Sequence, residues 1–534
     1  MFVLCCLLLQ FHFVYGCTTC KVRIDQTLKD TIHCKSGKIV DMSVSVVTSK
    51  EVLFVGGYSN SNRSVTGDTV FQVASLTKAF ASTLLVKLLE QNKRYSLDTT
   101  LKDILNNNNI FHDSLRSNHV TIRDLLSHRT GLPDHNMIRL DNNLTRVTVV
   151  ERLKYIEAEK EFRGSYLYSS VLYGVITYLA EIIGGNTWEN LVKEHIFDPL
   201  GMTSSTFVTT ANHRKIHLTT GYDEYFGELR SVSFEFASRY GELCGSGGIL
   251  TTARDMTKWM TFLLRGGQLD NGTRLLSKNA FDSLITPNNM IPDSSTSKYF
   301  SKPNVPATND RYAYGLGWMI GSYRGYRSIS HTGATYGYRA MISWYPDVDL
   351  GIFTVLTGVD LNSYYRQTLH NYIFDVYTNH SLYLNTSIIC TYPSPWFDQS
   401  PIMTKQPERK DKQISRHRRE YCGTYYNPAY GYIVLSEHND TNKLTLTYGY
   451  VTYVLYPSTN TDEFYGDSTG TSIHVFNLHI FRFLFKANDV SLEVPSFKSK
   501  SPPLFHRANI GYSINDTFSV MGIVFYLLLI NFVN

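Results

Sequence analysis

Two polar residues, Ser75 and Lys78, lie three positions apart in the otherwise apolar stretch FQVASLTKAF (71–80). Positions i and i+3 of a helix share a face, so the hydroxyl and the amine are expected to lie side by side. Serine is a weak nucleophile until a neighbouring group takes its proton. Burial lowers the pKa of a lysine, so that it can accept a proton near neutral pH. The pair therefore predicts a serine nucleophile activated by a lysine.

Other interpretations of these short patterns exist. Ser75 could cap the helix while its lysine faces solvent. Ser295–Lys298 repeats the S-x-x-K spacing, but it lies in a polar stretch that predicts a loop. Gly466–Gly470 fits G-x-S-x-G, yet a nucleophile elbow needs a helix after the serine, so a turn is predicted. Ser127 and His128 are adjacent, and local hydrogen bonding in a loop explains them better than a catalytic pair.

Two further motifs follow Ser75 in the chain. Tyr168-Ser169-Ser170 precedes an apolar helical pattern, and His331-Thr332-Gly333 lies near a predicted strand. With the first pair, these motifs resemble the S-x-x-K, Y-x-N and K-T-G motifs of serine β-lactamases and penicillin-binding enzymes. The variant with tyrosine in the second motif and histidine in the third resembles the motifs of one group within this family. That group contains the class C β-lactamases, D-alanyl-D-alanine peptidases and esterases. Linking segments such as TIRDLLSHRTGLPD (121–134) extend the resemblance over about residues 38–378.

The resemblance implies roles for three catalytic residues. Ser75 would be the acylated nucleophile, and Lys78 would be its proton acceptor or electrostatic helper. Tyr168 would act as a general base or proton relay, with a phenol pKa lowered by the nearby Lys78. No cofactor and no metal ion are expected for this chemistry.

The same resemblance implies which residues face the substrate. The backbone N–H groups of Ser75 and Ala334 would form the oxyanion hole. His331 and Thr332 would line the substrate side of an edge strand. Gly333 would leave room for a substrate lying against that strand.

Two positions depart from the pattern of β-lactam-processing relatives. Ser170 stands where those relatives have asparagine, so a short hydroxyl replaces an amide that both donates and accepts hydrogen bonds. His331 stands where they have lysine, which removes a permanent positive charge for a substrate carboxylate. Both changes argue against efficient hydrolysis of β-lactams or peptidoglycan and leave esterase or amidase chemistry open.

The chain of 534 residues is 43% apolar and 18% charged, which is typical of globular proteins. Its net charge of +5 is mild and forms no basic stripe, so nucleic-acid binding is not expected. Residues 39–58 and 340–358 each predict two strands around a polar turn, with helical patterns between them and a closing helix over 362–378. We therefore expect an α/β fold, an antiparallel sheet flanked by helices as in the β-lactamase/transpeptidase type, in which the two ends of the domain meet.

The predicted domain spans residues 17–378. A linker over 379–420 follows, with prolines and a run of charged residues. Residues 421–505 are rich in tyrosine, valine, threonine and phenylalanine in short alternating runs, which predicts a separate all-β module, a small barrel or half-barrel.

Several features predict an extracellular protein. Residues 1–16 form a short apolar run typical of a signal peptide. Six of the eight cysteines follow it, and disulfide bonds are expected, although the sequence does not determine their pairing. The glycosylation sequon N-x-[ST] occurs at Asn62, Asn143, Asn271, Asn379, Asn385, Asn439 and Asn515.

The last segment, residues 506–534, ends in the apolar run FSVMGIVFYLLLINFVN. The run is short for a membrane-spanning helix and no basic cluster follows it, so a removable signal for a GPI anchor is the favoured interpretation. A packed terminal segment is the alternative.

Two hypotheses for function follow from the sequence. The first is a secreted serine hydrolase that forms an acyl-enzyme on Ser75 with a small-molecule or peptide ester or amide. The second is an extracellular matrix protein, for example of the shell-matrix type, that keeps the fold with little or no turnover and binds other matrix components.

Overall fold

The computed structural model of the chain describes residues 17–34, 38–225, 227–235, 241–292, 305–396, 413–470, 479–486, 489–497 and 502–508. The predicted signal peptide, Asn515 and the apolar run that ends the chain lie outside these residues. Within the described part, no helix has both the length and the apolar character that a membrane crossing requires.

The central element is an antiparallel sheet of eight strands in the order β2-β1-β13-β12-β11-β10-β9-β8. Both predicted strand pairs are confirmed, and β1 pairs with β13, so the two ends of the domain meet in one sheet as expected. The strands are β1 (Ile39–Val47), β2 (Val52–Ser59), β8 (Asn289–Met290), β9 (Asn309–Tyr314), β10 (Met319–Tyr323), β11 (Tyr326–Thr335), β12 (Tyr338–Tyr345) and β13 (Leu350–Gly358).

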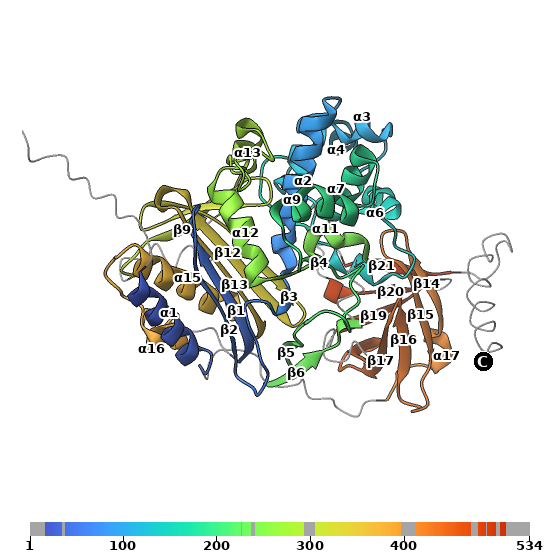
Figure 1. Cartoon of the computed structure of the whole chain (residues 1–534). Coiled ribbons are helices and arrows are strands. Elements are labelled where there is room, and N and C mark those ends of the chain that lie inside the picture. The colour runs from blue at the N-terminus through green and yellow to red at the C-terminus, as the bar shows by residue number, and fades with distance from the viewer. Residues whose placement is uncertain are drawn as a thin grey trace, which may run out of the picture.

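Helices cover both faces of this sheet (Figure 1). On one face lies α12 (Ala253–Leu264), whose buried side chains join the main apolar core. On the other face, α1 (Thr18–Thr31) and α15 (Tyr364–Tyr377) pack together over β1 and β13 in a second core. The structure thus confirms the predicted β-lactamase-type arrangement of an antiparallel sheet between helical layers.

Two long helices on the α12 side of the sheet begin at or beside residues singled out in the sequence. The helix α2 (Thr77–Asn92) is buried over most of its surface, and its Phe80 ring stacks on Trp259 of α12 with centroids 4.0 Å apart. The helix α7 (Ser170–Gly184) packs against α2 and also buries most of its side chains. Ser75, two residues before α2, and Ser170, the first residue of α7, lie in one pocket with residues of β11.

Shorter elements complete this domain. The helices are α3 (Leu101–Leu105), α4 (Ser114–His119), α5 (Ile122–Leu126), α6 (Arg146–Arg152), α8 (Trp188–Val192), α9 (Asp198–Leu200), α11 (Cys244–Gly247), α13 (Lys278–Leu284) and α16 (Thr386–Thr391). Single turns include η1 (Ala74–Leu76), η2 (Asn136–Leu140), η3 (Leu153–Tyr155), η4 (Lys193–Phe197), η5 (Gly241–Leu243), η6 (Pro346–Val348) and η7 (Leu361–Ser363). The strands β3 (Val70–Gln72), β4 (Thr206–Phe207) and β7 (Ile249–Thr252) form a small sheet, and β5 (Gly221–Tyr225) pairs with β6 (Glu228–Val232).

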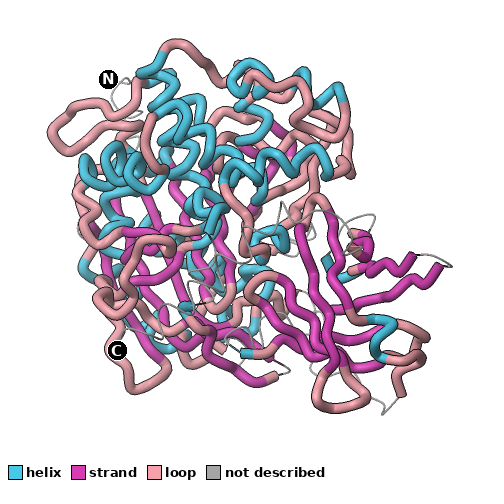
Figure 2. The backbone as a smooth tube through the Cα atoms, turned by 90° about the vertical axis from the view of Figure 1, so that its right-hand side faces the viewer, coloured by secondary structure: helices cyan, strands magenta, loops and turns pink. Residues whose placement is uncertain are grey.

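The C-terminal module is a closed eight-stranded barrel, which Figure 2 shows as a second group of strands beside the main sheet. Alternate residues point inward, and aromatic rings such as Tyr425, Phe464 and Phe483 fill the interior. Its elements are α17 (Arg418–Tyr421), β14 (Gly423–Asn427), β15 (Gly431–Glu437), β16 (Leu444–Tyr448), β17 (Val451–Pro457), β18 (Glu463–Ser468), β19 (His479–Lys486), β20 (Asp489–Glu493), η9 (Pro495–Phe497) and β21 (Leu504–Arg507).

The barrel is packed directly on the first domain. Tyr448 donates a hydrogen bond from its hydroxyl to the carbonyl of Met137 at 3.1 Å, and the Tyr430 hydroxyl contacts the His135 ring. Both contacts involve the segment 134–139, which lines the pocket described below. The barrel therefore supports one wall of that pocket.

Disulfide bonds join Cys17 to Cys20 and Cys34 to Cys390. The second bridge ties the start of the first domain to α16, within the segment predicted to be a linker. Cys244 is buried and Cys422 half-buried, and both carry free thiols.

Candidate active site

One pocket of about 600 Å³ collects residues from all three sequence motifs. They arrive from η1, from the loop before α7 and from the end of β11, three segments far apart in the chain. Its lining residues are Ser75, Asp134, Asn136, Arg139, Tyr166, Tyr168, Ser170, Asp223, Met319, His331, Thr332, Ala334, Thr335, Tyr336 and Arg339. The pocket is the candidate active site.

Ser75 and Lys78 face one another at the start of α2. The lysine Nζ donates a hydrogen bond to the serine Oγ at 3.2 Å and a second one to the carbonyl of Ser246 at 2.8 Å. Ser75 itself lies in the turn η1 and not in the helix, and the residue before it, Ala74, has a left-handed φ of 47°. This turn presents the serine to the pocket while Lys78 remains inside the protein.

Lys78 is fully buried, with an exposed fraction of 0%. Burial disfavours the charged ammonium and lowers its pKa to about 7, although the nearby Asp134 carboxylate opposes this shift. At neutral pH the amine is therefore neutral in a large part of the molecules. A neutral amine within hydrogen-bond distance of Ser75 Oγ has the position and the pKa of a general base.

Tyr168 lies next to this pair. The Nζ of Lys78 is 4.8 Å from the centroid of the Tyr168 ring. The ring of His128 packs against the ring of Tyr168, with centroids 4.4 Å apart. His128 Nδ1 also accepts a hydrogen bond from the N–H of Ser169 at 3.2 Å. The buried histidine thus holds the segment 168–169 against the lysine.

His331 has both ring nitrogens occupied within the protein. Its Nδ1 lies 2.7 Å from the carbonyl of Thr332, which only accepts, so this nitrogen carries the proton. Its Nε2 then accepts a hydrogen bond from the hydroxyl of Tyr314 at 2.9 Å. Burial and the nearby Lys78 lower the pKa of His331 to about 3. The imidazole is therefore neutral at physiological pH and provides no permanent cation for a substrate.

The strand that carries His331 is not an edge strand, contrary to the prediction. β10 pairs with β11 from Tyr326 to Ser330 and ends there, whereas β12 continues along β11 to Thr335. Among the described residues, the segment after Ser330 therefore pairs on one side only, and Thr332 and Ala334 line the pocket from its open edge. β11 is therefore paired with strands on both sides up to Ser330, and beside the pocket it is paired with β12 alone.

Position 333 requires glycine for a structural reason that was not evident from the sequence. A Cβ at this position would lie 2.3 Å from the backbone carbonyl of Val73 and 3.1 Å from Leu76 Cδ1. Substrate clearance was the predicted reason, but the immediate neighbour is the turn that carries Ser75. Glycine allows β11 to pack closely on the nucleophile turn.

Replacing Gly333 with alanine is expected to push β11 away from Ser75, because a backbone carbonyl cannot yield as a side chain does. We expect kcat to fall by about 10²-fold, since small displacements of catalytic groups cost this much. Overpacking should also lower the free energy of unfolding by about 1–3 kcal/mol. Steady-state kinetics and thermal unfolding measure the two effects.

Ser328→Thr is the matched control, because it adds one methyl group to a half-buried position of the same strand. It should leave kcat within about twofold. Equal losses in both variants would mean that the close approach at Gly333 has no special role.

Ser170 is the first residue of α7, and its N–H donates a hydrogen bond to Asp134 Oδ1 at 2.7 Å. The other oxygen of Asp134 accepts from the amide of Asn136 at 2.6 Å. Burial raises the pKa of the Asp134 carboxyl, while the Ser170 N–H and the nearby Lys78 act in the opposite direction. A half-buried carboxylate and an amide therefore lie beside the position where relatives have an asparagine side chain.

Sequence reasoning missed Asp134, His128 and Tyr314 as members of this site. Asp134 and His128 both lie in the segment 121–134, which carries the family resemblance but no catalytic motif. Tyr314 has no local signal, since it ends β9 and reaches His331 only through the fold of the sheet.

The dependence of activity on pH follows from the pKa of Lys78. Below about pH 7 the amine is protonated and cannot accept the serine proton. We expect kcat/KM to rise through an apparent pKa near 7 and to fall about tenfold per unit below it. A pH profile with a neutral ester substrate measures this limb.

The assignment of the limb to Lys78 is tested with His331→Gln. The pKa of His331 is about 3, so its replacement should leave the midpoint near 7 in place even if the rate changes. Loss of the limb in this variant would assign it to the histidine instead.

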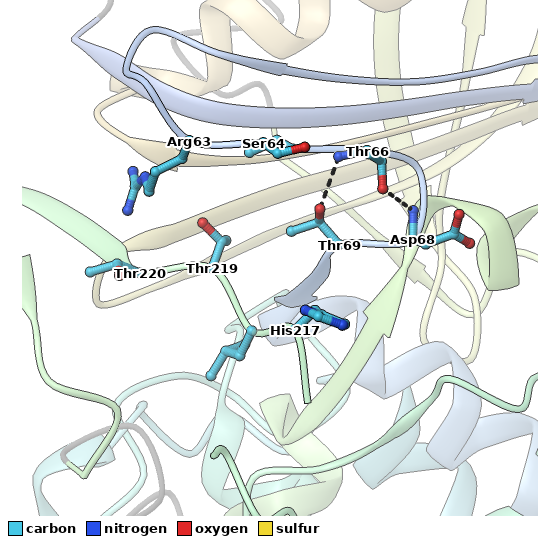
Figure 3. A pocket seen from close by; sticks show the side chains of 10 residues that line it. Arg63, Ser64, Thr66, Asp68, Thr69, His217, Thr219 and Thr220 are labelled. Carbon is cyan, nitrogen blue, oxygen red and sulfur yellow. Dashed lines mark hydrogen bonds between the residues drawn. The ribbon is translucent and has the colours of Figure 1, made fainter. Parts of the chain in front are cut away.

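A second hollow of about 600 Å³ lies around Arg63 and His217 (Figure 3). Its polar groups are held by the protein itself: Thr69 Oγ1 accepts from the N–H of Thr66 at 2.9 Å, and Arg63 pairs with the buried Asp41 at 2.8 Å. The described residues that line it include no tyrosine and no residue of the three sequence motifs. This hollow therefore lacks the serine–lysine–tyrosine set of the first pocket.

Comparisons with known proteins agree with this geometry. Residues 24–373, about two thirds of the chain, match the protein family described as Beta-lactamase. Gigasin-6 of Magallana gigas is 32% identical over 249 residues, which cover 45% of this chain and 82% of the relative. The Unguisins hydrolase ungD' of Aspergillus campestris is 25% identical over 437 residues, 76% of each chain.

Solved structures share the fold. A penicillin-binding protein homologue from Pyrococcus abyssi aligns over 91% of this chain and 99% of its own, with a TM-score of 0.55 and 18% identity. The D-amino acid amidase of Ochrobactrum anthropi aligns over 68% of this chain and 99% of its own, with a TM-score of 0.53 and 21% identity. Since the family match covers more than half of the chain and its three motifs meet in one pocket, the chain belongs to the beta-lactamase family of serine hydrolases.

Proposed function

We propose that the protein hydrolyses an ester or amide through an acyl-enzyme on Ser75. The observation that carries this proposal is the fully buried Lys78 amine, with a pKa of about 7, at 3.2 Å from Ser75 Oγ. Burial of an amine costs free energy, and a purely structural role for Lys78 would not explain why this cost is tolerated. Activation of Ser75 by the amine would explain why Lys78 is buried there.

The reaction takes two steps. The Oγ of Ser75 attacks the substrate carbonyl while its proton passes to the Lys78 amine, and the N–H groups of Ser75 and Ala334 hold the oxyanion. The leaving group departs with a proton delivered from Lys78 or through the Tyr168 hydroxyl. Water then attacks the acyl-enzyme, and the same groups take its proton and return one to Ser75.

The substrate class is inferred from the residue at position 331 and from the aromatic residues that line the pocket. The neutral His331 provides no fixed cation where β-lactam-processing relatives have lysine, which disfavours substrates that must anchor a carboxylate there. Uncharged acyl groups on an ester or amide suit the aromatic wall formed by Tyr166, Tyr168 and Tyr336. The name of one similar protein, an unguisins hydrolase, supports hydrolysis, and the name of another, a D-amino acid amidase, supports amides among the substrates.

The protein is further proposed to act outside the cell. All six sequon asparagines within the described residues have exposed side chains, which glycosylation requires. They are Asn62, Asn143, Asn271, Asn379, Asn385 and Asn439. Two disulfide bonds support the same oxidising compartment. The signal peptide over 1–16 and the GPI-anchor signal within 506–534 belong to this proposal.

The test uses the purified full-length protein from a secreting host. A fluorophosphonate probe should label it, and peptide mass spectrometry should place the adduct on Ser75. Turnover should then be found among small acyl esters and amides of D- and L-amino acids. Absence of both labelling and turnover would overturn the proposal and favour a matrix protein that keeps the fold without catalysis.

A further inference from the structure

A buried ion pair lies behind the strand that carries the oxyanion donor. Arg366 of α15 and Asp360, just before that helix, are each about 1% exposed, and Arg366 Nε lies 2.6 Å from Asp360 Oδ2. The carboxylate also accepts from the N–H groups of Tyr365 at 2.9 Å and Arg366 at 3.3 Å. Such pairs contribute little to stability, because removing two charges from water costs about as much as they regain. Its position therefore calls for another explanation.

The guanidinium reaches the backbone of the sheet. Arg366 Nη1 donates a hydrogen bond to the carbonyl of Gly333 at 2.9 Å, and it also contacts the carbonyl of Ala340. Gly333 and Ala340 are opposite each other in the ladder between β11 and β12. One nitrogen can reach both oxygens only if both carbonyls point into the space between these two strands.

This contact shows where the next N–H points. Gly333 C=O and Ala334 N–H belong to the same peptide unit, and in a trans peptide they point in opposite directions. Because the carbonyl is directed towards β12, the N–H of Ala334 is directed towards the open edge of β11. The pocket that contains Ser75 lies on that edge.

The charge of the guanidinium acts on the same peptide. A cation that hydrogen-bonds a peptide carbonyl draws electron density through the amide and makes its N–H a stronger donor. Arg366 therefore adds to the strand pairing in holding the direction of the Ala334 N–H, and it increases the partial positive charge of that N–H. Preorganised donors of this kind stabilise the developing oxyanion.

We propose that Arg366, held by Asp360, is a positioning residue that orients and polarises the Gly333–Ala334 peptide for oxyanion stabilisation. The inference rests on the proposed hydrolase function of Ser75. It assigns a catalytic purpose to a helix that lies on the opposite side of the sheet from α12. It also explains why a charged pair is kept at a place where both side chains are about 1% exposed.

The kinetic test compares Arg366→Met and Arg366→Lys with a matched control. Arg324→Met is the control, since Arg324 also pairs with an aspartate of α15, Asp375, at 2.6 Å but lies at the turn between β10 and β11. We expect kcat to fall about 10- to 10²-fold in Arg366→Met with KM within about threefold, because the contact matters in the transition state. The lysine variant should lose about tenfold, and the control should keep its kcat.

A second measurement does not depend on activity. In protein labelled with ¹⁵N-alanine, the Ala334 amide proton should move upfield in both Arg366 variants. The peptide loses the cation in Arg366→Met, and in Arg366→Lys it loses the guanidinium nitrogen that contacts both carbonyls. The Arg324→Met variant should leave this resonance in place. If Arg366→Met does not fold, Arg366→Lys carries both measurements.

The outcomes separate the two proposals. A wild-type protein without Ser75-dependent turnover would overturn the hydrolase function, whereas the Ala334 resonance would still report on the peptide. Full kcat in the Arg366 variants, or an unchanged Ala334 resonance, would overturn the role of Arg366 while leaving the hydrolase function in place.

Discussion

Ser75→Ala is expected to abolish labelling by a fluorophosphonate and to reduce kcat by at least about 10⁴-fold, as loss of the nucleophile does in serine hydrolases. The variant should keep the fold, because Ser75 lies in a short turn at the pocket and alanine fills the same space without the hydroxyl. Gel fluorescence with the probe and steady-state kinetics with an acyl ester measure the two losses, and circular dichroism checks the fold.

The chain offers a matched control in its second S-x-x-K pair. Ser295→Ala removes the serine from the same tetrapeptide pattern at Ser295–Lys298, which lies outside the described residues. It should keep both labelling and turnover. If labelling survives in Ser75→Ala and disappears in Ser295→Ala, the nucleophile is Ser295 and the proposed mechanism is wrong.

Much of the fold was predictable because its signals are local. Residues 39–58 and 340–358 place apolar and β-branched residues around polar turns, and both form the predicted strand pairs. The buried helix after Ser75 follows from a pattern that is apolar nearly all round. The three motifs predicted one site because their order matched a known family, and Ser75, Tyr168 and His331 indeed line one pocket.

The remaining features of the site depend on contacts between distant segments. The Tyr430 hydroxyl reaches His135 across 295 residues, and no pattern near either residue marks this contact. Asp134 meets the N–H of Ser170 only after α7 has packed beside the segment 121–134. The reason for Gly333 is likewise a carbonyl contributed by another segment, at Val73. Periodicity describes one element at a time and contains no information about such neighbours.

The barrel illustrates the same limit with a functional consequence. Its alternating strands are evident from the sequence, but its place beside the pocket is not. Tyr448 holds the carbonyl of Met137, and the neighbouring Asn136 and Arg139 line the pocket. The C-terminal module is therefore part of the support for the site, so its removal would alter the pocket wall as well as the length of the protein.

Lys78→Met is expected to lower kcat by about 10³-fold, within the range for loss of a general base. Methionine keeps the length and volume of the side chain but cannot take the proton of Ser75. The residue is fully buried, so the substitution places an apolar group in a site closed to water. Lys87→Met is the matched control on the same helix, since that lysine is half-buried and donates to the carbonyl of Leu275. It should keep its kcat within about twofold.

The same substitution is expected to increase stability, which distinguishes lost chemistry from lost folding. The pKa of Lys78 is about 7 in the folded protein and 10.5 by its ordinary value, so folding below pH 7 buries a charged amine. Between these values the unfolded chain binds more protons, and the wild-type free energy of unfolding therefore rises with pH in that window. Removing the amine should add about 1–3 kcal/mol at pH 6, after the lost hydrogen bonds to Ser75 and Ser246 are subtracted. The gain should shrink towards zero near pH 10. Chemical denaturation of both proteins at pH 6 and pH 9.5 measures the difference, and a variant that is less stable at pH 6 would contradict the assignment of Lys78 as a buried base.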